Sequence, residues 1–182
     1  MRKIVVFNMI FVFLLSIFCF GQQVKAYKLI SGWKFSNPKK IEYNIDKSAS
    51  KYSSVMSSGI STWQYTSKIK IKKSVSNIPA GQRVLISYLN KDTTAYASAT
   101  KSGSTRTIGF FKGFSKLSET KKKETVVHEF GHQLGLAHTQ TTNDKKAVMR
   151  ALGFNNKAYP LGDDKKGISK IYWGGHIQWK RK

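Results

Sequence analysis

The stretch HEFGHQLGLAH, from His128 to His138, contains three of the four histidines of this 182-residue chain. Residues four positions apart in a helix lie on the same face, so His128 and His132 can present two imidazoles to one ion. Gly135 is a predicted helix end, because glycine accepts the left-handed conformation that ends many helices. The chain can then turn back and bring His138 in as a third ligand. Three protein ligands leave one tetrahedral position for water, which is typical of a catalytic zinc site.

Glu129 lies beside the two helical histidines and is not needed as a ligand, which suits its carboxylate to proton transfer. The plainer interpretation is a helix whose histidines lie on a solvated surface. The intact spacing of all the motif positions argues against it. The remaining histidine, His176, lies near the C-terminus between Trp173 and Trp179 and is predicted to be solvated or packed instead of ligating.

An HExxH pair followed by a glycine and a third histidine is the signature of the metzincin zinc proteases. Metzincins carry a turn with a methionine beneath the zinc, and Met149 follows eleven residues after His138. The segment YPLGDDKKGISKIYW, residues 159–173, resembles the last helix of the matrixins, the matrix-metalloproteinase-like branch. The resemblance continues toward the N-terminus in residues of a first strand and of the helix after it: Trp33, Ile41, Tyr43, Ile45 and Trp63.

This resemblance, over roughly residues 33 to 173, implies an α+β fold of the zincin or metzincin type. The expected parts are a twisted mixed sheet, an active-site helix, a second long helix and a small C-terminal subdomain that ends in a helix. The N-terminal subdomain would extend to about residue 138, and residues 139–182 would form the C-terminal one.

The resemblance also implies a secreted zinc-dependent endopeptidase that acts on proteins or peptides. One catalytic Zn²⁺, held by His128, His132 and His138, would activate a water molecule, with Glu129 as general base. Met149 would form the floor beneath the imidazoles. These expectations make the chain a metalloprotease of the hydrolase class.

Further expectations concern the surroundings of the site. Either Asp163 or Asp164 would tie the last helix to the methionine turn, and Asp163 is also a candidate N-cap of that helix. An extended substrate would pair with an edge strand at Thr107 to Phe111. The specificity pocket would be built by residues between Thr139 and Tyr159.

Two metal sites of the matrixins are not expected in this chain. Matrixins usually bind a structural zinc through histidines before the active-site helix, and no histidine precedes His128. They also bind calcium through acidic loops, whereas only Asp92 and Glu119 lie between residues 47 and 123. Calcium takes six to eight oxygen ligands, so we expect one zinc and no calcium. A cysteine switch is not expected either.

The N-terminus has the composition of a secretory signal peptide. Arg2 and Lys3 precede an apolar run from Ile4 to Phe20, and Val24-Lys25-Ala26 offers a cleavage site after Ala26. The apolar run is short for a membrane anchor, which needs roughly 20 residues. The predicted domains are therefore a signal peptide, residues 1–26, and one catalytic domain, residues 27–182. The sole cysteine, Cys19, would be removed with the signal peptide.

The charge of the chain is strongly basic, with a formal net charge of +23. The predicted signal peptide contains Arg2, Lys3 and Lys25 and no acid, so residues 27–182 retain 29 basic and nine acidic residues, a net charge of +20. Anionic cell-wall polymer or membrane lipid is one candidate partner, and a merely solvated lysine coat is the alternative. Lysine predominates over arginine, which indicates diffuse attraction instead of specific nucleic-acid recognition. We expect a secreted monomer, for which association with the cell wall is the open alternative to a solvated lysine coat.

Local patterns predict several elements. Alternating apolar residues predict a half-buried strand at 41–45. Residues 48–66 predict an amphipathic helix capped by Ser48. Short strands are expected at 84–88, 95–100 and 107–111, a turn at 79–81, and a zinc helix that begins near Ser118 or Thr120.

Two other function classes remain open. One is a zinc hydrolase that acts on cell-wall peptides instead of proteins, which a basic surface would suit. The other is an inactive polycationic surface-binding protein with a vestigial metal motif.

Overall fold

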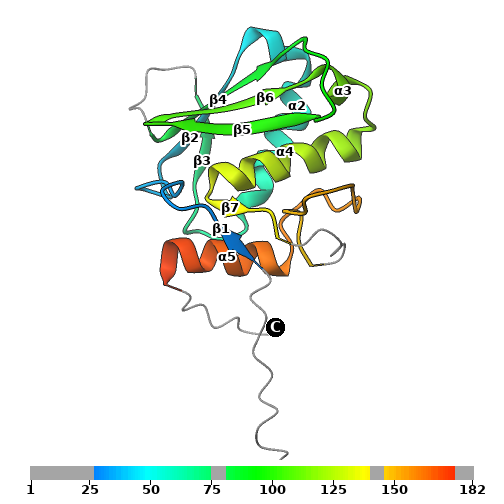
Figure 1. Ribbon diagram of the computed structural model, residues 1–182. Helices are drawn as coiled ribbons and strands as arrows, with labels where there is room; N and C mark the ends of the chain where they lie inside the picture. Colours follow the sequence, from blue (N-terminus) through cyan, green and yellow to red (C-terminus); the bar gives the residue numbers. More distant parts are fainter. Residues whose placement is uncertain (1–26, 75–80, 140–145, 175–182) are drawn as a thin grey trace, which may run out of the picture.

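The structure is a computed structural model, and it describes residues 27–74, 81–139 and 146–174 (Figure 1). The predicted signal peptide, most of the predicted turn at 79–81, His176 and Trp179 lie outside these residues. Within them, the helices are too short or too polar to cross a membrane.

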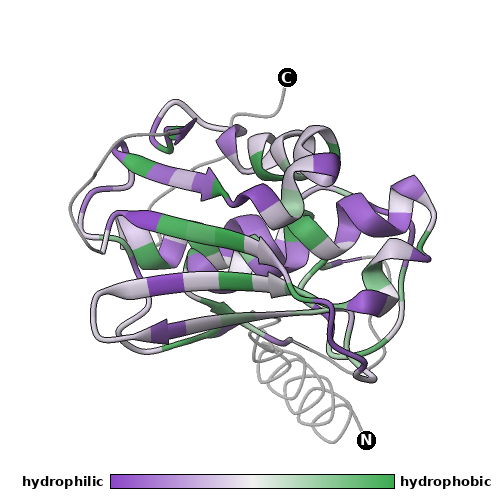
Figure 2. Cartoon of the chain, turned by 90° about the horizontal axis from the view of Figure 1, so that it is seen from above, coloured by the Kyte–Doolittle hydropathy of each residue, from purple (hydrophilic) through white to green (hydrophobic). Residues whose placement is uncertain are grey.

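A five-stranded sheet forms the upper layer in Figure 1. Its strands are β2 (Ile41–Ile45), β3 (Ile71–Lys73), β4 (Arg83–Tyr88), β5 (Ala97–Ser102) and β6 (Thr105–Phe110), in the spatial order β3-β2-β4-β6-β5. β5 runs antiparallel to β6, and the other neighbours are parallel. Hydrophilic and hydrophobic residues both occur along these strands (Figure 2), as expected where one face of a sheet is covered and the other is open.

The predicted strands are confirmed, but the predicted edge strand is wrong. Thr107 to Phe110 belong to β6, which lies inside the sheet because it pairs with β4 on one side and β5 on the other. The hairpin turn at Gly103, whose φ is +56°, returns the chain so that β5 becomes the edge. The sequence pattern identified both strands of the hairpin but not which of them lies outside.

The second helical segment is irregular, in contrast to the long helix expected. It consists of a 3₁₀ helix η1 (Lys47–Tyr52), the α-helix α2 (Ser53–Ser61) and a 3₁₀ turn η2 (Thr62–Gln64). Its cap is Asp46, not Ser48: the Asp46 carboxylate accepts a hydrogen bond from the Ser48 backbone N–H at 2.8 Å. The Ser48 hydroxyl instead accepts a hydrogen bond from the backbone N–H of Tyr88.

A short helix α3 (Lys112–Ser115) leads into α4 (Glu119–Gln133), which lies beneath the sheet, and α5 (Gly162–Trp173) forms the lowest layer (Figure 1). A two-stranded ribbon between α4 and α5 pairs β1 (Lys28–Leu29) with β7 (Leu136–Ala137).

The hydrophobic core fills the space between the sheet, α2 and α4. Trp63 is fully buried there and donates its indole N–H to the Val127 carbonyl of α4 at 3.0 Å. Trp63 also packs so closely on α4 that a Cβ atom added at Gly131 would lie 2.9 Å from its ring. These contacts hold α4 in a fixed position under the sheet.

Candidate metal centre

The helix α4 begins where the sequence predicts. The Ser118 hydroxyl accepts a hydrogen bond from the Lys121 backbone N–H, as an N-cap residue does. The helix is capped at its C-terminus by Leu134, and Gly135 follows with a φ of +102°. This left-handed glycine turns the chain into β7, which leads directly to His138.

The end of α4 is fixed by a buried arginine. Arg106 of β6 donates hydrogen bonds to three backbone carbonyls, those of Gln133, Lys34 and Gly81, at 3.0 to 3.1 Å. Because a helix C-terminus carries partial negative charge, a cation at this place is favourable. Arg106 thus joins the sheet to the helix end that precedes the third histidine.

The structure brings the three predicted histidines together. Nε2 of His138 lies 3.0 Å from Nε2 of His128 and 3.1 Å from Nε2 of His132. All three ligand atoms lie within 4.8 Å of one another. Two of these side chains come from α4, and the third belongs to the residue directly after β7.

The protonation pattern indicates that this cluster suits a cation. Nδ1 of His128 faces the Val148 carbonyl at 2.9 Å, and Nδ1 of His132 faces the Leu136 carbonyl at 2.7 Å. A carbonyl only accepts, so each Nδ1 carries the proton and each Nε2 presents a lone pair. Nε2 lone pairs that converge at about 3 Å repel one another, whereas a tetrahedral Zn²⁺ with bonds of about 2.0–2.1 Å would satisfy all of them.

Burial keeps these imidazoles neutral. It lowers the pKa of His128 to about 3 and that of His132 to about 4, and it lowers the pKa of His138 as well. A neutral imidazole is the form that binds a metal. The residues present therefore fit one zinc ion.

Glu129 lies next to this cluster and is largely buried. Burial raises the pKa of its carboxyl to about 7, although a hydrogen bond from the Ala99 backbone of β5 acts in the opposite direction. A carboxyl group with a pKa near neutrality can both take and return a proton at physiological pH.

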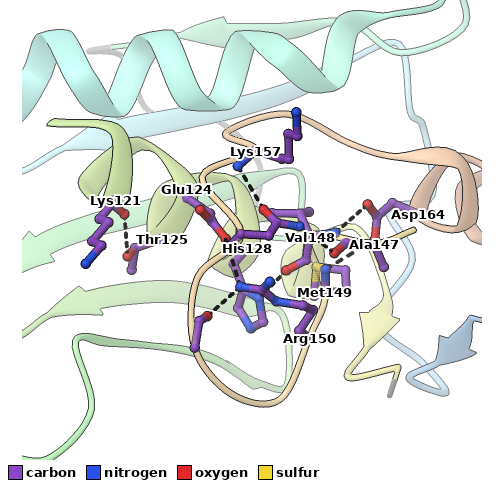
Figure 3. A network of polar contacts seen from close by, with 12 residues as sticks. Lys121, Glu124, Thr125, His128, Ala147, Val148, Met149, Arg150, Lys157 and Asp164 are labelled. Carbon is purple, nitrogen blue, oxygen red and sulfur yellow. Dashed lines mark hydrogen bonds and ion pairs between the residues drawn. The ribbon is translucent and has the colours of Figure 1, made fainter. Parts of the chain in front are cut away.

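A turn anchored by α5 lies beside His128 (Figure 3). Met149 is fully buried, and a Cβ at Gly131 would collide with its sulfur. The Asp164 carboxylate accepts hydrogen bonds from the backbone N–H groups of Val148 at 2.8 Å and Met149 at 3.2 Å. Asp164 is thus the aspartate that ties α5 to the methionine turn, and through the Val148 carbonyl it also orients His128.

Asp163 has a different role from the one expected. It is the second residue of α5 and not its N-cap, a position that Leu161 occupies. Asp164 accepts the Leu161 backbone N–H at 2.7 Å, which satisfies one of the free donors at the helix start. The two aspartates are adjacent in the sequence, and the sequence alone did not determine which of them contacts the methionine turn.

A cavity of about 520 Å³ opens beside the histidines. One wall is formed by residues 94–97, before and at the start of β5. Another is formed by Val148 and residues 150–154, which fall within the segment expected to build the specificity pocket, and α4 and His138 supply the rest of the lining.

The pairing of two charged cavity residues was not predicted from the sequence. Arg150, directly after Met149, donates to the Glu124 carboxylate at 3.1 Å and to the Gly153 carbonyl at 2.7 Å (Figure 3). The side chains of Arg150 and Glu124 are only 2% and 4% exposed. One available signal was that Glu124 precedes His128 by four residues, which places an acid on the same helix face as the ligands.

Known proteins share both the sequence pattern and the fold of this chain. Residues 26–155 match the family model of astacin, a family of peptidases. Two solved structures of myroilysin share the fold. The first has a TM-score of 0.59 and 15% sequence identity, and the match covers 80% of this chain and 98% of that chain. The other has a TM-score of 0.56, 17% identity and coverage of 79% and 87%. No curated protein matches the sequence.

Proposed function

Because the chain belongs to the astacin family of peptidases and is a zinc metalloendopeptidase, we propose that His128, His132 and His138 bind its catalytic zinc and that Glu129 is its general base. The observation that carries this proposal is the convergence of three Nε2 atoms beside a buried carboxyl group.

The family match confirms the metzincin fold but corrects the predicted branch. The astacins are a different branch from the matrixins. The features that suggested a matrixin, above all the paired aspartates Asp163 and Asp164, concern how the last helix is anchored. They do not determine the branch.

The proposed chemistry assigns separate roles to the residues. Bound zinc would polarise the substrate carbonyl and lower the pKa of a bound water to about 7. Glu129 takes a proton from the attacking water and delivers it to the leaving amine, for which its pKa near 7 is suited. Met149 packs beneath the imidazoles and limits their movement.

The substrate would be a protein or peptide bound in extended form along β5, the edge strand of the sheet. The contact between the Ala99 backbone and Glu129 supports this path, because it places the middle of β5 next to the general base. Export through the N-terminal signal peptide would bring the enzyme to substrates outside the cell.

A second candidate substrate is the peptide portion of a cell wall, which the net charge of +20 would favour. Incubating the purified, zinc-loaded protein with a denatured protein and with purified peptidoglycan separates the two. We expect fragments from the denatured protein. Release of peptidoglycan fragments with the protein left intact would contradict the proposal, and inactivity of the zinc-loaded protein toward both would contradict the proposed roles of the site residues.

A further inference from the structure

If the proposed function holds, the direction of β5 determines on which side of the scissile bond the cavity beside the histidines lies. β5 runs from Ala97 to Ser102. We take the substrate to add antiparallel to β5, because antiparallel pairing is the more stable of the two kinds; such a strand runs from the Ser102 end toward the Ala97 end. Ala99 marks the position of Glu129, and residues 94–97 line the cavity. The cavity therefore receives the side chain on the carboxyl side of the cleaved bond.

The cavity is roomy and mostly uncharged. Small residues, including Ala95, Ala97 and Ala151, leave space in its walls. Tyr96 and Phe154 approach each other from opposite walls, with ring centroids 5.5 Å apart, and add aromatic surface. This lining suits a large side chain with a hydrophobic body.

The lining also contains one ion pair of an unusual kind. Arg150 and Glu124 are both nearly inaccessible to solvent, and each has further hydrogen bonds: Arg150 donates to the Gly153 carbonyl, and Glu124 accepts from the Asn155 backbone N–H at 2.9 Å. The pair is thus held within the wall. Because its two opposite charges lie close together, they largely cancel each other's effect on a side chain in the cavity.

We propose that Glu124 and Arg150 are specificity-determining residues, which by neutralising each other make this cavity select large uncharged side chains and reject charged ones. A charged side chain that enters loses its hydration and meets no net opposite charge in return. If either partner loses its charge, the other becomes a buried, unbalanced charge that attracts substrates of the opposite sign. Two other charges face the cavity region, Glu129 in the lining and Lys121 with its ammonium 5.4 Å from the Phe154 ring centroid. Both remain constant when only the pair is changed.

The first test uses the unaltered, zinc-loaded enzyme. Peptides that differ only in the residue after the cleaved bond, with Phe, Leu, Asp or Lys at that position, are compared by kcat/KM. We expect Phe and Leu to exceed both Asp and Lys by about tenfold or more. Equal cleavage of the Asp or Lys peptide would overturn the inference, and this measurement does not depend on any variant folding.

The second test uses Glu124→Gln, whose side-chain carbonyl can still accept from Arg150 and Asn155. We expect the ratio of Asp to Leu cleavage to rise about tenfold or more, while the ratio of Lys to Leu does not rise. Arg150→Gln should shift the preference toward Lys. The matched control is Glu119→Gln, which removes an acid from the same helix at a site 76% exposed and should leave both ratios unchanged.

The outcomes separate this inference from the proposed function. A folded, zinc-loaded Glu124→Gln enzyme with unchanged ratios would overturn the role of the pair. Failure of the unaltered enzyme to cleave any peptide of the series would instead contradict the proposed activity. A variant that merely loosens the fold would lower kcat/KM for all peptides together and leave the ratios unchanged, which also counts against the inference.

Discussion

Glu129 is the residue on which the proposed chemistry depends most directly. Glu129→Gln should lower kcat by about 10²–10⁴, because an amide cannot take the proton from water. Zinc content should be unchanged, since the three imidazoles are intact. Peptide hydrolysis and metal analysis of the same sample check this. Glu119→Gln, on an exposed part of the same helix, serves as the control, and full activity of zinc-loaded Glu129→Gln would contradict the assignment.

Gly131 is a residue whose importance is visible only in the packing. An added Cβ would collide with the Met149 sulfur and lie 2.9 Å from the Trp63 ring. Gly131→Ala should therefore reduce the free energy of unfolding by about 1–3 kcal/mol, as overpacking does. Gly162→Ala is the matched control, because a Cβ there meets nothing within 4 Å. Urea unfolding of both variants measures the difference, and equal midpoints would show that Met149 is not confined.

The sequence predicted single residues well where a motif fixes their spacing. The convergence of His128, His132 and His138 was predictable, because helix geometry and one glycine determine their positions. Arg150 and Glu124 could not be assigned to each other, because their contact depends on how the segment after Met149 folds back on α4. A pairing between elements far apart in sequence leaves no local pattern.

The contact between α5 and the methionine turn helps to fix the position of a residue in the metal site. Asp164 receives three backbone N–H groups, and the turn it holds orients His128 through the Val148 carbonyl. In Asp164→Asn, one oxygen becomes an NH₂ group that faces N–H donors. We expect a loss of roughly 1–3 kcal/mol in the free energy of unfolding and a zinc affinity lower by about 10–100-fold.

The neighbouring Asp163 provides a control for this prediction. It is similarly buried, but its carboxylate meets the Lys166 ammonium at 3.5 Å instead of the backbone of the methionine turn. Asp163→Asn should thus change zinc affinity much less than Asp164→Asn. Competition with a chelator measures both. Equal effects would mean that burial, and not the link to the turn, determines the result.

Helices and strands were predictable from the sequence where the periodicity of apolar residues is strong. They were less predictable where their arrangement depends on which other strands they pair with. The strand at 41–45 and the start of α4 were predicted correctly, since alternation and a serine cap are local signals. Strand order was not predictable: whether β5 or β6 forms the edge depends on the pairing of β6 with β4. For this reason the proposed substrate path follows β5, the edge strand, and not Thr107–Phe111.

At the scale of the whole molecule, several acidic side chains are buried while many lysines are exposed on the surface. Of the eight acidic residues that the structure describes, four are buried: Glu124, Glu129, Asp163 and Asp164. One group of exposed lysines, which we term the basic face, lies on α5 and on the segments that precede β2 and β3. Its members are Lys39, Lys40, Lys68, Lys70, Lys166 and Lys170. The hydrogen bond from Lys70 N–H to the Pro38 carbonyl and the position of the Lys68 ammonium over Trp173 connect these segments.

We expect this charge to bind the enzyme to anionic vesicles or wall polymer. Salt should release it, because the screening length is about 10 Å at 0.1 M. Lys68→Glu with Lys70→Glu should weaken retention more than Lys91→Glu with Lys116→Glu, which changes the total charge equally at a different place. Equal retention on anionic and neutral vesicles would show that the lysines form only a solvated coat.

The metal content of the whole domain is the remaining prediction: one zinc and no requirement for calcium. His128, His132 and His138 account for one site, and no histidine precedes them that could supply a second. A structural zinc would need four protein ligands of its own. A chelator should therefore stop hydrolysis, and zinc alone should restore it. Because the site joins α4 to the segment after Gly135, zinc loss should also lower the thermal unfolding midpoint. Two tightly held zinc ions per chain, or recovery that requires calcium, would mean that other residues bind metal.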